Sequence, residues 1–184
     1  MTGASDDRRD AAAAGEPGWV VWLTGLSGTG KTTVARLLLP LVHDAHPGTI
    51  LLDGDELREA LAFESGHSLE ERRRWARSYG GLAALLARQG HNVIVATVSL
   101  FADVRRANRA ELQHYFEVHL RAPLDVLRAR DHRGVYRGEN VVGVDLPAEL
   151  PSDPDLVCDT DASTPDEVAL RIWAELSRRM TDAR

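Results

Sequence analysis

Apolar residues fall along the chain in short runs, and these runs alternate with longer segments whose apolar positions have helical spacing. The runs predict buried strands at residues 19–23, 49–52, 92–98, 115–120 and 156–158. The spaced segments predict helices over residues 33–39, 68 to about 89, 102–112 and 123–130, with a last helix from 165. This alternation is typical of an α/β fold, in which a mostly parallel sheet lies between two helical layers and ligands bind at the carboxyl ends of the strands.

Helix-end signals agree with this pattern. Ser68 with Glu71, and Thr164 with Glu167, have the spacing of capping boxes, and Gly90 is placed to end the long helix. Pro40 and the Pro47-Gly48 pair punctuate the chain between the first helix and the second strand. Residues 131–154 are rich in glycine and proline and predict a loop.

A single domain is expected from a length of 184 residues. Residues 1–17 mix acidic residues, arginines and an alanine run without apolar periodicity, and we interpret them as a disordered tail before a domain at 18–184. A transit peptide is the alternative, but such peptides contain few acidic residues.

Composition narrows the class of partner. A formal net charge of −6 argues against nucleic-acid binding, which needs an excess of basic residues. One cysteine, Cys158, excludes an internal disulfide and any cysteine-based metal cluster. No apolar run approaches the roughly 20 residues that cross a membrane. We therefore expect a cytoplasmic protein with neither a nucleic-acid nor a membrane partner.

A phosphate loop follows the first strand. Residues 25–32, Gly-Leu-Ser-Gly-Thr-Gly-Lys-Thr, fit G-x-x-x-x-G-K-[ST] between a strand and a helix. Backbone N–H groups would surround a polyphosphate, Lys31 would reach the β- and γ-phosphates, and Thr32 would ligate Mg²⁺. A glycine-rich turn with a chance lysine is the alternative, but strand, loop and helix all agree. The expected ATP-binding residues in this part of the chain are Gly25, Ser27, Gly28, Thr29, Gly30, Lys31, Thr32 and Thr33.

Two carboxylates follow the second strand, which we expect to lie beside the phosphate-loop strand. Phosphoryl transfer requires one anionic group near Mg²⁺ and another that orients or deprotonates the acceptor hydroxyl, and Asp53 and Asp55 can supply both. A turn with a solvated aspartate and a helix N-cap is the alternative. Arg58 falls one turn into the following helix.

A run of arginines lies near the start of the long helix. Arg73 and Arg77 are four residues apart and share a face, whereas Arg72 points elsewhere. A solvated basic face and an arginine clamp for an anionic substrate are both consistent with this pattern. The histidines lack metal-site spacing.

These motifs together carry a family resemblance. GLSGTGKTT, LDGDELR, a downstream Ser-x-x-Glu-Arg, APLDVLRARD, GVY and NVVGVD resemble the adenylylsulfate (APS) kinase family over essentially residues 18–180. The resemblance implies a phosphate-loop α/β domain, a homodimer, and transfer of the γ-phosphate of MgATP to the 3′-hydroxyl of adenosine 5′-phosphosulfate. By position it implies Asp55 as the base with Asp53 beside it, acceptor contacts from Arg58, Arg72, Arg77 and Ser99, and a nucleotide contact from Arg130, which leads a short lid around 131–142.

The chain departs from this family in the acceptor pocket. The family usually holds adenine between two phenylalanines, where this sequence has His67 and Val141, and Trp75 stands in place of an asparagine. The lid is also shorter than usual, and NVVGVD resembles members that act on other nucleotides, such as cytidine diphosphoramidate kinase. Stacking contributes about 1–3 kcal/mol per base, so losing both phenylalanines would weaken adenylylsulfate binding unless His67 and Trp75 form a new platform. We therefore expect an anionic nucleotide-like acceptor, with adenylylsulfate either a weak substrate or bound through a different base platform.

A nucleotide-dependent switch is the candidate from a different class. The sequence lacks the guanine-reading N-K-x-D motif and a strand that ends in the h-h-h-D-x-x-G pattern of a GTPase. Both absences favour a small-molecule kinase.

Overall fold

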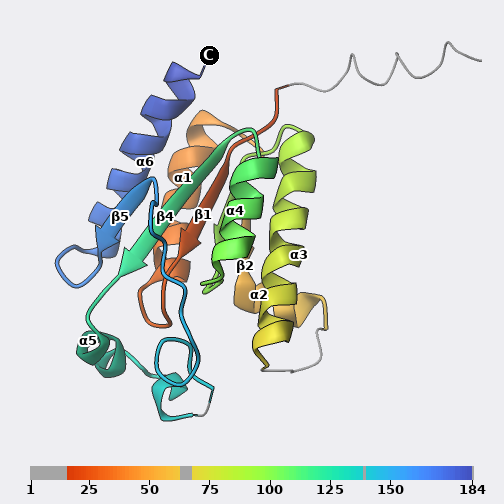
Figure 1. The fold of residues 1–184 in the computed structure, drawn as a ribbon. Helices are drawn as coiled ribbons and strands as arrows, with labels where there is room; N and C mark the ends of the chain where they lie inside the picture. Colours follow the sequence, from red (N-terminus) through yellow and green to blue (C-terminus); the bar gives the residue numbers. More distant parts are fainter. Residues whose placement is uncertain (1–15, 63–67, 139, 184) are drawn as a thin grey trace, which may run out of the picture.

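The computed structural model describes residues 16–62, 68–138 and 140–183. In this part of the chain, five parallel strands form one sheet in the order β2-β3-β1-β4-β5 (Figure 1). The predicted α/β class is confirmed, and the sheet is wholly parallel. The strands are β1 (Val20–Thr24), β2 (Ile50–Asp53), β3 (Val93–Ala96), β4 (Tyr115–Arg121) and β5 (Leu156–Asp159).

Helices cover both faces of the sheet and make the expected three layers (Figure 1). One face packs on α1 and α6, and the other on α3, with α4 packed against α3. In the described ranges, no helix is both long and apolar enough to span a bilayer. The helices are α1 (Lys31–Ala45), α2 (Gly54–Ala60), α3 (Leu69–Arg88), α4 (Ala102–Glu111), α5 (Leu124–Ala129), a 3-10 turn (Val135–Arg137) and α6 (Pro165–Asp182).

β1 forms the centre of the core, and all five of its residues are buried. Val21 and Leu23 pack in the cluster that includes α1 and α6, whereas Val20 and Trp22 pack in the cluster that includes α3. A strand buried on both faces needs apolar residues at successive positions, which is why β1 is a continuous apolar run in the sequence.

The helix-end predictions hold at both capping boxes and fail at Pro40. Ser68 and Thr164 each cap their helix as expected. The first helix, however, continues through Pro40 to Ala45. Pro40 lies on the exposed side, where the carbonyl that it leaves unpaired can meet water, while buried Leu38 and Val42 hold the helix on the sheet.

The expected neighbour of the phosphate-loop strand is wrong. β2 pairs with β3, and β3 lies between β2 and β1. Ala96 of β3 is in register with Leu23 on one side and with Asp53 on the other. The connection through α1 therefore skips one strand position, but it still brings Asp53 to the carboxyl edge of the sheet, where the phosphate loop begins.

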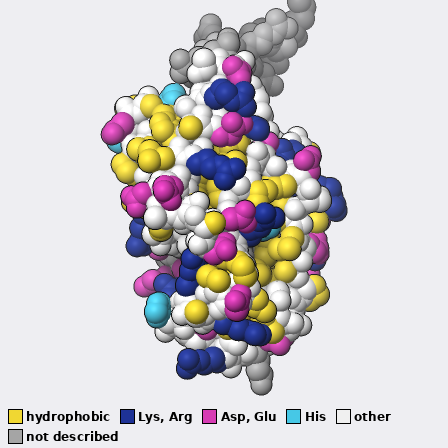
Figure 2. Space-filling view, turned by 90° about the vertical axis from the view of Figure 1, so that its left-hand side faces the viewer, with side chains coloured by type: hydrophobic (Ala, Val, Ile, Leu, Met, Phe, Trp, Pro, Cys, Tyr) yellow, Lys and Arg dark blue, Asp and Glu magenta, His cyan; other side chains and the backbone are white. Residues whose placement is uncertain are grey.

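The surface on the α6 and β5 side of the molecule has mixed charge. Figure 2 shows acidic and basic side chains interspersed there, with apolar side chains between them. This face has no continuous basic area of the kind that follows a nucleic-acid backbone.

Candidate active site

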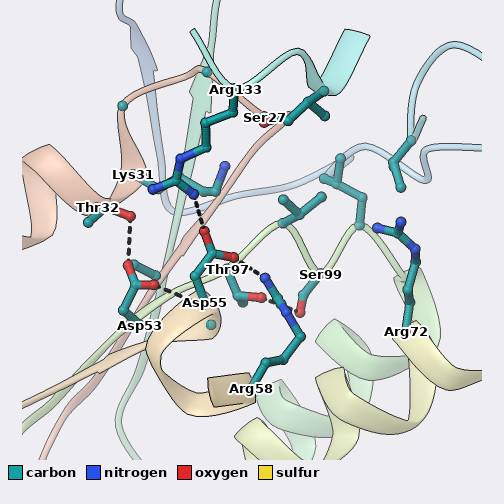
Figure 3. Close-up of a pocket in the computed structure, with 18 of the residues that line it drawn as sticks. Ser27, Lys31, Thr32, Asp53, Asp55, Arg58, Arg72, Thr97, Ser99 and Arg133 are labelled. Carbon is teal, nitrogen blue, oxygen red and sulfur yellow. Dashed lines mark hydrogen bonds and ion pairs between the residues drawn. The ribbon is translucent and has the colours of Figure 1, made fainter. Parts of the chain in front are cut away.

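A cavity of about 540 Å³ opens at the carboxyl ends of the strands. Its walls come from the phosphate loop, the β2–α2 turn, the first half of α3, the loop after β3 and the segment around residues 130–147. Figure 3 shows the polar side chains of these elements converging on the cavity. The position agrees with the expectation for parallel α/β sheets.

The phosphate loop needs glycine at positions where the backbone turns tightly. Gly25 has φ +153°, and a Cβ atom there would lie 2.1 Å from the Leu120 carbonyl oxygen. Gly30 is the N-cap of α1 in a left-handed conformation and offers no side chain to cap the helix. The first N–H groups of α1 consequently face the cavity entrance with the positive end of the helix dipole, which favours a bound anion.

The side chain of Lys31 is held inside this loop. Its ammonium donates to the carbonyl oxygen of Leu26 at 2.7 Å. Burial lowers the pKa of Lys31 to about 8, although the negative charge of Asp53 opposes that shift. The negative charge of a bound polyphosphate would strongly stabilise the protonated form of Lys31, which burial disfavours.

Asp53 connects the phosphate loop to the β2–α2 turn. One carboxylate oxygen accepts from the Thr32 hydroxyl at 2.6 Å, and the other accepts from the backbone N–H of Asp55 at 2.9 Å. Asp53 is thus the N-cap of α2 as well as the partner of Thr32. The helix N-cap that the sequence indicated is therefore confirmed, although Asp53 is buried and not solvated. Its role near Mg²⁺ stays a prediction.

Asp55 lies between the two halves of the cavity. Its carboxylate pairs with Arg58 of α2 and, at 2.8 Å, with Arg133 of the segment that follows α5 (Figure 3). The side chain is half-exposed, so the carboxylate is accessible to a ligand. The two guanidinium contacts leave acceptor positions free on the Asp55 carboxylate for a ligand hydroxyl.

The half of the cavity beyond Asp55 has two basic side chains and an aromatic ring. Arg58 and Arg72 line it, and the Arg58 guanidinium carbon lies 5.7 Å from the centroid of the Trp75 ring. Burial, together with the positive charge of Arg58, lowers the pKa of Arg72. A guanidinium still remains charged near neutrality, so two like charges converge there and an anionic group would relieve their repulsion.

Ser99 lines the same part of the cavity as these arginines (Figure 3). It is buried at the cavity surface, and its hydroxyl lies 3.0 Å from the hydroxyl of Thr97. Thr97 and Ser99 both follow β3. The loop after β3, the strand between β2 and β1, therefore supplies this part of the wall.

Three of the expected acceptor residues are not placed in the cavity. Arg77 points to α4, where it pairs with Asp103 at 2.9 Å. Val141 is buried, with its N–H donated to Asp145, and its neighbour Val142 lines the cavity instead. His67 lies outside the described residues.

The segment after α5 contributes contacts that sequence reasoning missed. The hydroxyl of Tyr136 donates to the carbonyl oxygen of Ser27 at 2.7 Å, which fixes this segment against the phosphate loop. Asp131 shapes the turn by accepting the N–H groups of Val135 and Tyr136. An aspartate three residues before Gly134 is a recognisable turn signal, and it could have indicated this structure.

Arg130 lines the cavity, and its side chain is also hydrogen-bonded to Thr160, which directly follows β5. Its guanidinium donates to the carbonyl and hydroxyl oxygens of Thr160 at 2.8 and 3.2 Å. The remaining predicted nucleotide residues occupy the loop itself. Those that line the cavity are Ser27, Gly28, Gly30, Lys31, Thr32 and Thr33, whereas Gly25 and Thr29 shape the loop from behind.

A phosphate loop, a threonine paired with an aspartate, and a second carboxylate facing an arginine-lined half-cavity define a phosphate-loop kinase for a small anionic acceptor. Comparison with known proteins identifies the family. A family model described as adenylylsulphate kinase matches residues 17–159, and the chain belongs to this family.

Curated relatives from the same family are similar to this chain over most of its length. The adenylyl-sulfate kinase of Rippkaea orientalis is 38% identical over 167 residues, which cover 88% of this chain and 92% of that protein. The adenylyl-sulfate kinase of Pseudomonas aeruginosa is 39% identical over 165 residues, covering 85% and 84%. The chain is therefore a phosphotransferase of the adenylylsulfate-kinase type, which uses ATP and acts on a hydroxyl group.

Solved structures show the same fold. The APS kinase of Mycobacterium tuberculosis, solved with AMPPNP and APS, matches with a TM-score of 0.81 at 33% identity, covering 89% of this chain and 99% of that one. A second structure, titled APE1195, matches with a TM-score of 0.80 at 33% identity, covering 90% and 98%.

Proposed function

We propose that the enzyme transfers the γ-phosphate of ATP to the 3′-hydroxyl of adenosine 5′-phosphosulfate. One observation carries this proposal: Asp55 lies in a single cavity between a phosphate loop and the pair formed by Arg58 and Arg72. A phosphosulfate acceptor is anionic, so its charge is complementary to that of the two arginines.

The proposed reaction assigns a role to each side chain. The bond from the γ-phosphorus to the β–γ bridging oxygen breaks as a bond to the acceptor oxygen forms, and Asp55 takes the hydroxyl proton. Lys31 and the N–H groups at the start of α1 compensate charge on the polyphosphate. Arg133, which pairs with Asp55 in the free enzyme, has an exposed guanidinium and lies close enough to exchange that carboxylate for a phosphate.

Mg²⁺ fits the same end of the phosphate loop. The Thr32 hydroxyl and the Asp53 carboxylate are oxygen ligands of the hard type that Mg²⁺ prefers, and they lie 2.6 Å apart. We propose that these two residues hold the ion, directly or through water. Bound there, Mg²⁺ would neutralise phosphate charge during transfer.

Trp75 is the proposed platform for the acceptor base. It lines the half of the cavity beyond Asp55 (the acceptor half). Val141, at one of the two usual phenylalanine positions, does not line the cavity. The missing phenylalanine favours a second candidate acceptor, another anionic nucleotide such as a cytidine diphosphate derivative. Both candidates would place an anionic tail near Arg58 and Arg72, and they differ in the base that Trp75 would contact.

The test is a panel of acceptors with wild-type enzyme and MgATP. It should contain adenylylsulfate, cytidine and adenosine nucleotides with anionic tails, and gluconate as an acceptor without a base. Each reaction is read by mass spectrometry for an acceptor that has gained one phosphoryl group. Adenylylsulfate should have the highest kcat/KM. A higher value for a cytidine nucleotide would select the second candidate, and phosphorylation of gluconate alone would contradict both.

We further propose that the enzyme works as a homodimer in the cytoplasm. The resemblance to a family of dimers supports the first part, and the presence of a single cysteine supports a reducing compartment. Light scattering after size exclusion tests the assembly, and cell fractionation tests the compartment. A monomer or a hexamer would contradict the dimer. A related structure from Thiobacillus denitrificans, titled as hexameric, matches at 28% identity with a TM-score of 0.68, covering 89% of this chain and 30% of that one.

A further inference from the structure

A cluster of four charged side chains lies beside the acceptor half of the cavity. Asp103, at the start of α4, pairs with both Arg73 and Arg77 of α3, at 2.9 Å from Arg77. Arg73 also lies 3.6 Å from a carboxylate oxygen of Glu149, which belongs to the segment between the 3-10 turn and β5. All four are described residues, and none lines the cavity. The proposed reaction gives them no role.

The cluster joins three separate pieces of the acceptor wall. Arg73 is on α3, Asp103 is on α4 and Glu149 is on the later loop, and these segments are distant in sequence. Each of the three lies within two residues of a side chain that lines the cavity: Arg72 before Arg73, Phe101 before Asp103, and Pro147 before Glu149.

Glu149 holds the loop after β3 at two points. Its backbone N–H donates to the Leu100 carbonyl oxygen at 3.1 Å, and its carboxylate accepts the N–H of Ala102 at 2.6 Å. Phe101, between these points, is the N-cap of α4 and caps no N–H group through its side chain. Glu149 thus caps α4 from outside that helix. The guanidinium carbon of Arg73 lies 4.8 Å from the centroid of the Phe101 ring, which adds a third restraint.

These contacts suggest how the acceptor site keeps its shape. Residues 99–101 are buried, and Phe101 packs in one apolar cluster with Ala76 of α3. Glu149 adds polar restraints to this packing, at the Leu100 carbonyl oxygen and at the N–H of Ala102. Without these restraints, acceptor binding would have to restore part of the order of the loop.

We propose that Glu149 is a positioning residue for the acceptor site, holding residues 99–101 against α3 in the conformation that the acceptor binds. The inference deepens the proposed function and rests on it for the identity of the acceptor. Glu149 touches neither the phosphate loop nor Asp55, so its loss should affect acceptor binding and leave nucleotide binding unchanged.

Steady-state kinetics of Glu149→Ala and Glu149→Gln with adenylylsulfate and ATP provide the first test. Glu149→Ala should raise the acceptor KM by about five- to tenfold, the scale of one exposed hydrogen bond, with the ATP KM within about twofold of wild type. Glu149→Gln should lie closer to wild type, because its amide oxygen can still accept the N–H of Ala102. Glu175→Ala is the matched control, since Glu175 is likewise a glutamate that forms ion pairs, here with Arg178 and Arg179 of α6.

An unchanged acceptor KM in Glu149→Ala would overturn the proposal. So would an equal rise in both KM values, or the same rise in Glu175→Ala, because each indicates a general loss of structure.

Hydrogen exchange without substrate tests Glu149 independently of the acceptor. Amides of residues 100–102 should exchange faster in Glu149→Ala than in wild type, and the phosphate loop should not change. Unchanged exchange at these amides would overturn the proposal even if the kinetics differed. A wild-type enzyme that phosphorylates no nucleotide would contradict the proposed function alone, and the exchange measurement would then decide on Glu149.

Discussion

The pKa of Lys31 should rise by about two pH units or more when nucleotide binds. In the free enzyme its pKa is lowered to about 8 by burial, and its ammonium donates to a neutral carbonyl, that of Leu26. A polyphosphate in the loop would place negative charge against the ammonium and return the pKa to about 10 or above. Nucleotide binding should therefore take up a proton near pH 8.

The size of the effect on affinity follows from this titration. With a pKa of about 8, roughly nine tenths of the free enzyme is charged at Lys31 at pH 7 and roughly one tenth at pH 9. Only the charged form suits the polyphosphate, so affinity is full below the free-enzyme pKa and falls as the pH rises through it. The Kd for ATP should increase about tenfold between pH 7 and pH 9.

Lys31 can be observed alone because it is the only lysine in the sequence. Protein labelled with ¹³C at lysine Cε should give one side-chain resonance, whose titration reports this pKa with and without the non-hydrolysable analogue AMPPNP. Lys31→Arg is the matched control, since a guanidinium stays charged over this range and its nucleotide Kd should not vary with pH. A resonance that titrates near pH 10.5 in the free enzyme, or one that nucleotide leaves unchanged, would refute the reasoning.

Three substitutions test the remaining roles by steady-state kinetics. Asp55→Asn should lower kcat by about 10²–10⁴-fold, with the KM for ATP little changed, because a base acts in the transition state; a change confined to the ATP KM would make Asp55 a nucleotide-site residue. Trp75→Ala should raise the acceptor KM by the equivalent of about 1–3 kcal/mol, and efficient turnover that is indifferent to this change would show that the base lies elsewhere. Arg72→Ala should raise the acceptor KM far more than Arg77→Ala, because only Arg72 lines the cavity; equal effects would contradict the division between them.

Local signals predicted most of the fold. Apolar runs found all five strands of the described sheet, and the capping boxes at Ser68 and Thr164 located two helix starts. The order of the strands could not be predicted from these local signals, because the apolar pattern of β2 is the same whether β1 or β3 lies beside it. Pro40 misled for a related reason: packing of Leu38 and Val42 on the sheet outweighs a local preference.

The residues of the candidate site also fall into two groups: those that local spacing reveals and those whose position depends on packing. The phosphate loop and Asp53 could be recognised because their chemistry depends on a short, fixed spacing. Helical spacing also separated Arg72 from Arg73 correctly. The spacing could not show whether Arg72 or Arg73 points to the cavity. That depends on how α3 packs, with Tyr79 buried against the sheet and Ala76 beside α4.

The most direct test of the central claim follows the γ-phosphate itself. Wild-type enzyme is incubated with adenylylsulfate and ATP labelled with ¹⁸O in the γ-phosphate, and the products are separated and fragmented by mass spectrometry. The account predicts that the labelled phosphate appears on the 3′-oxygen of the adenylylsulfate, in equal amount to the ADP formed. Labelled inorganic phosphate with unmodified adenylylsulfate would contradict it, since the chain would then hydrolyse ATP, as a nucleotide-dependent switch does.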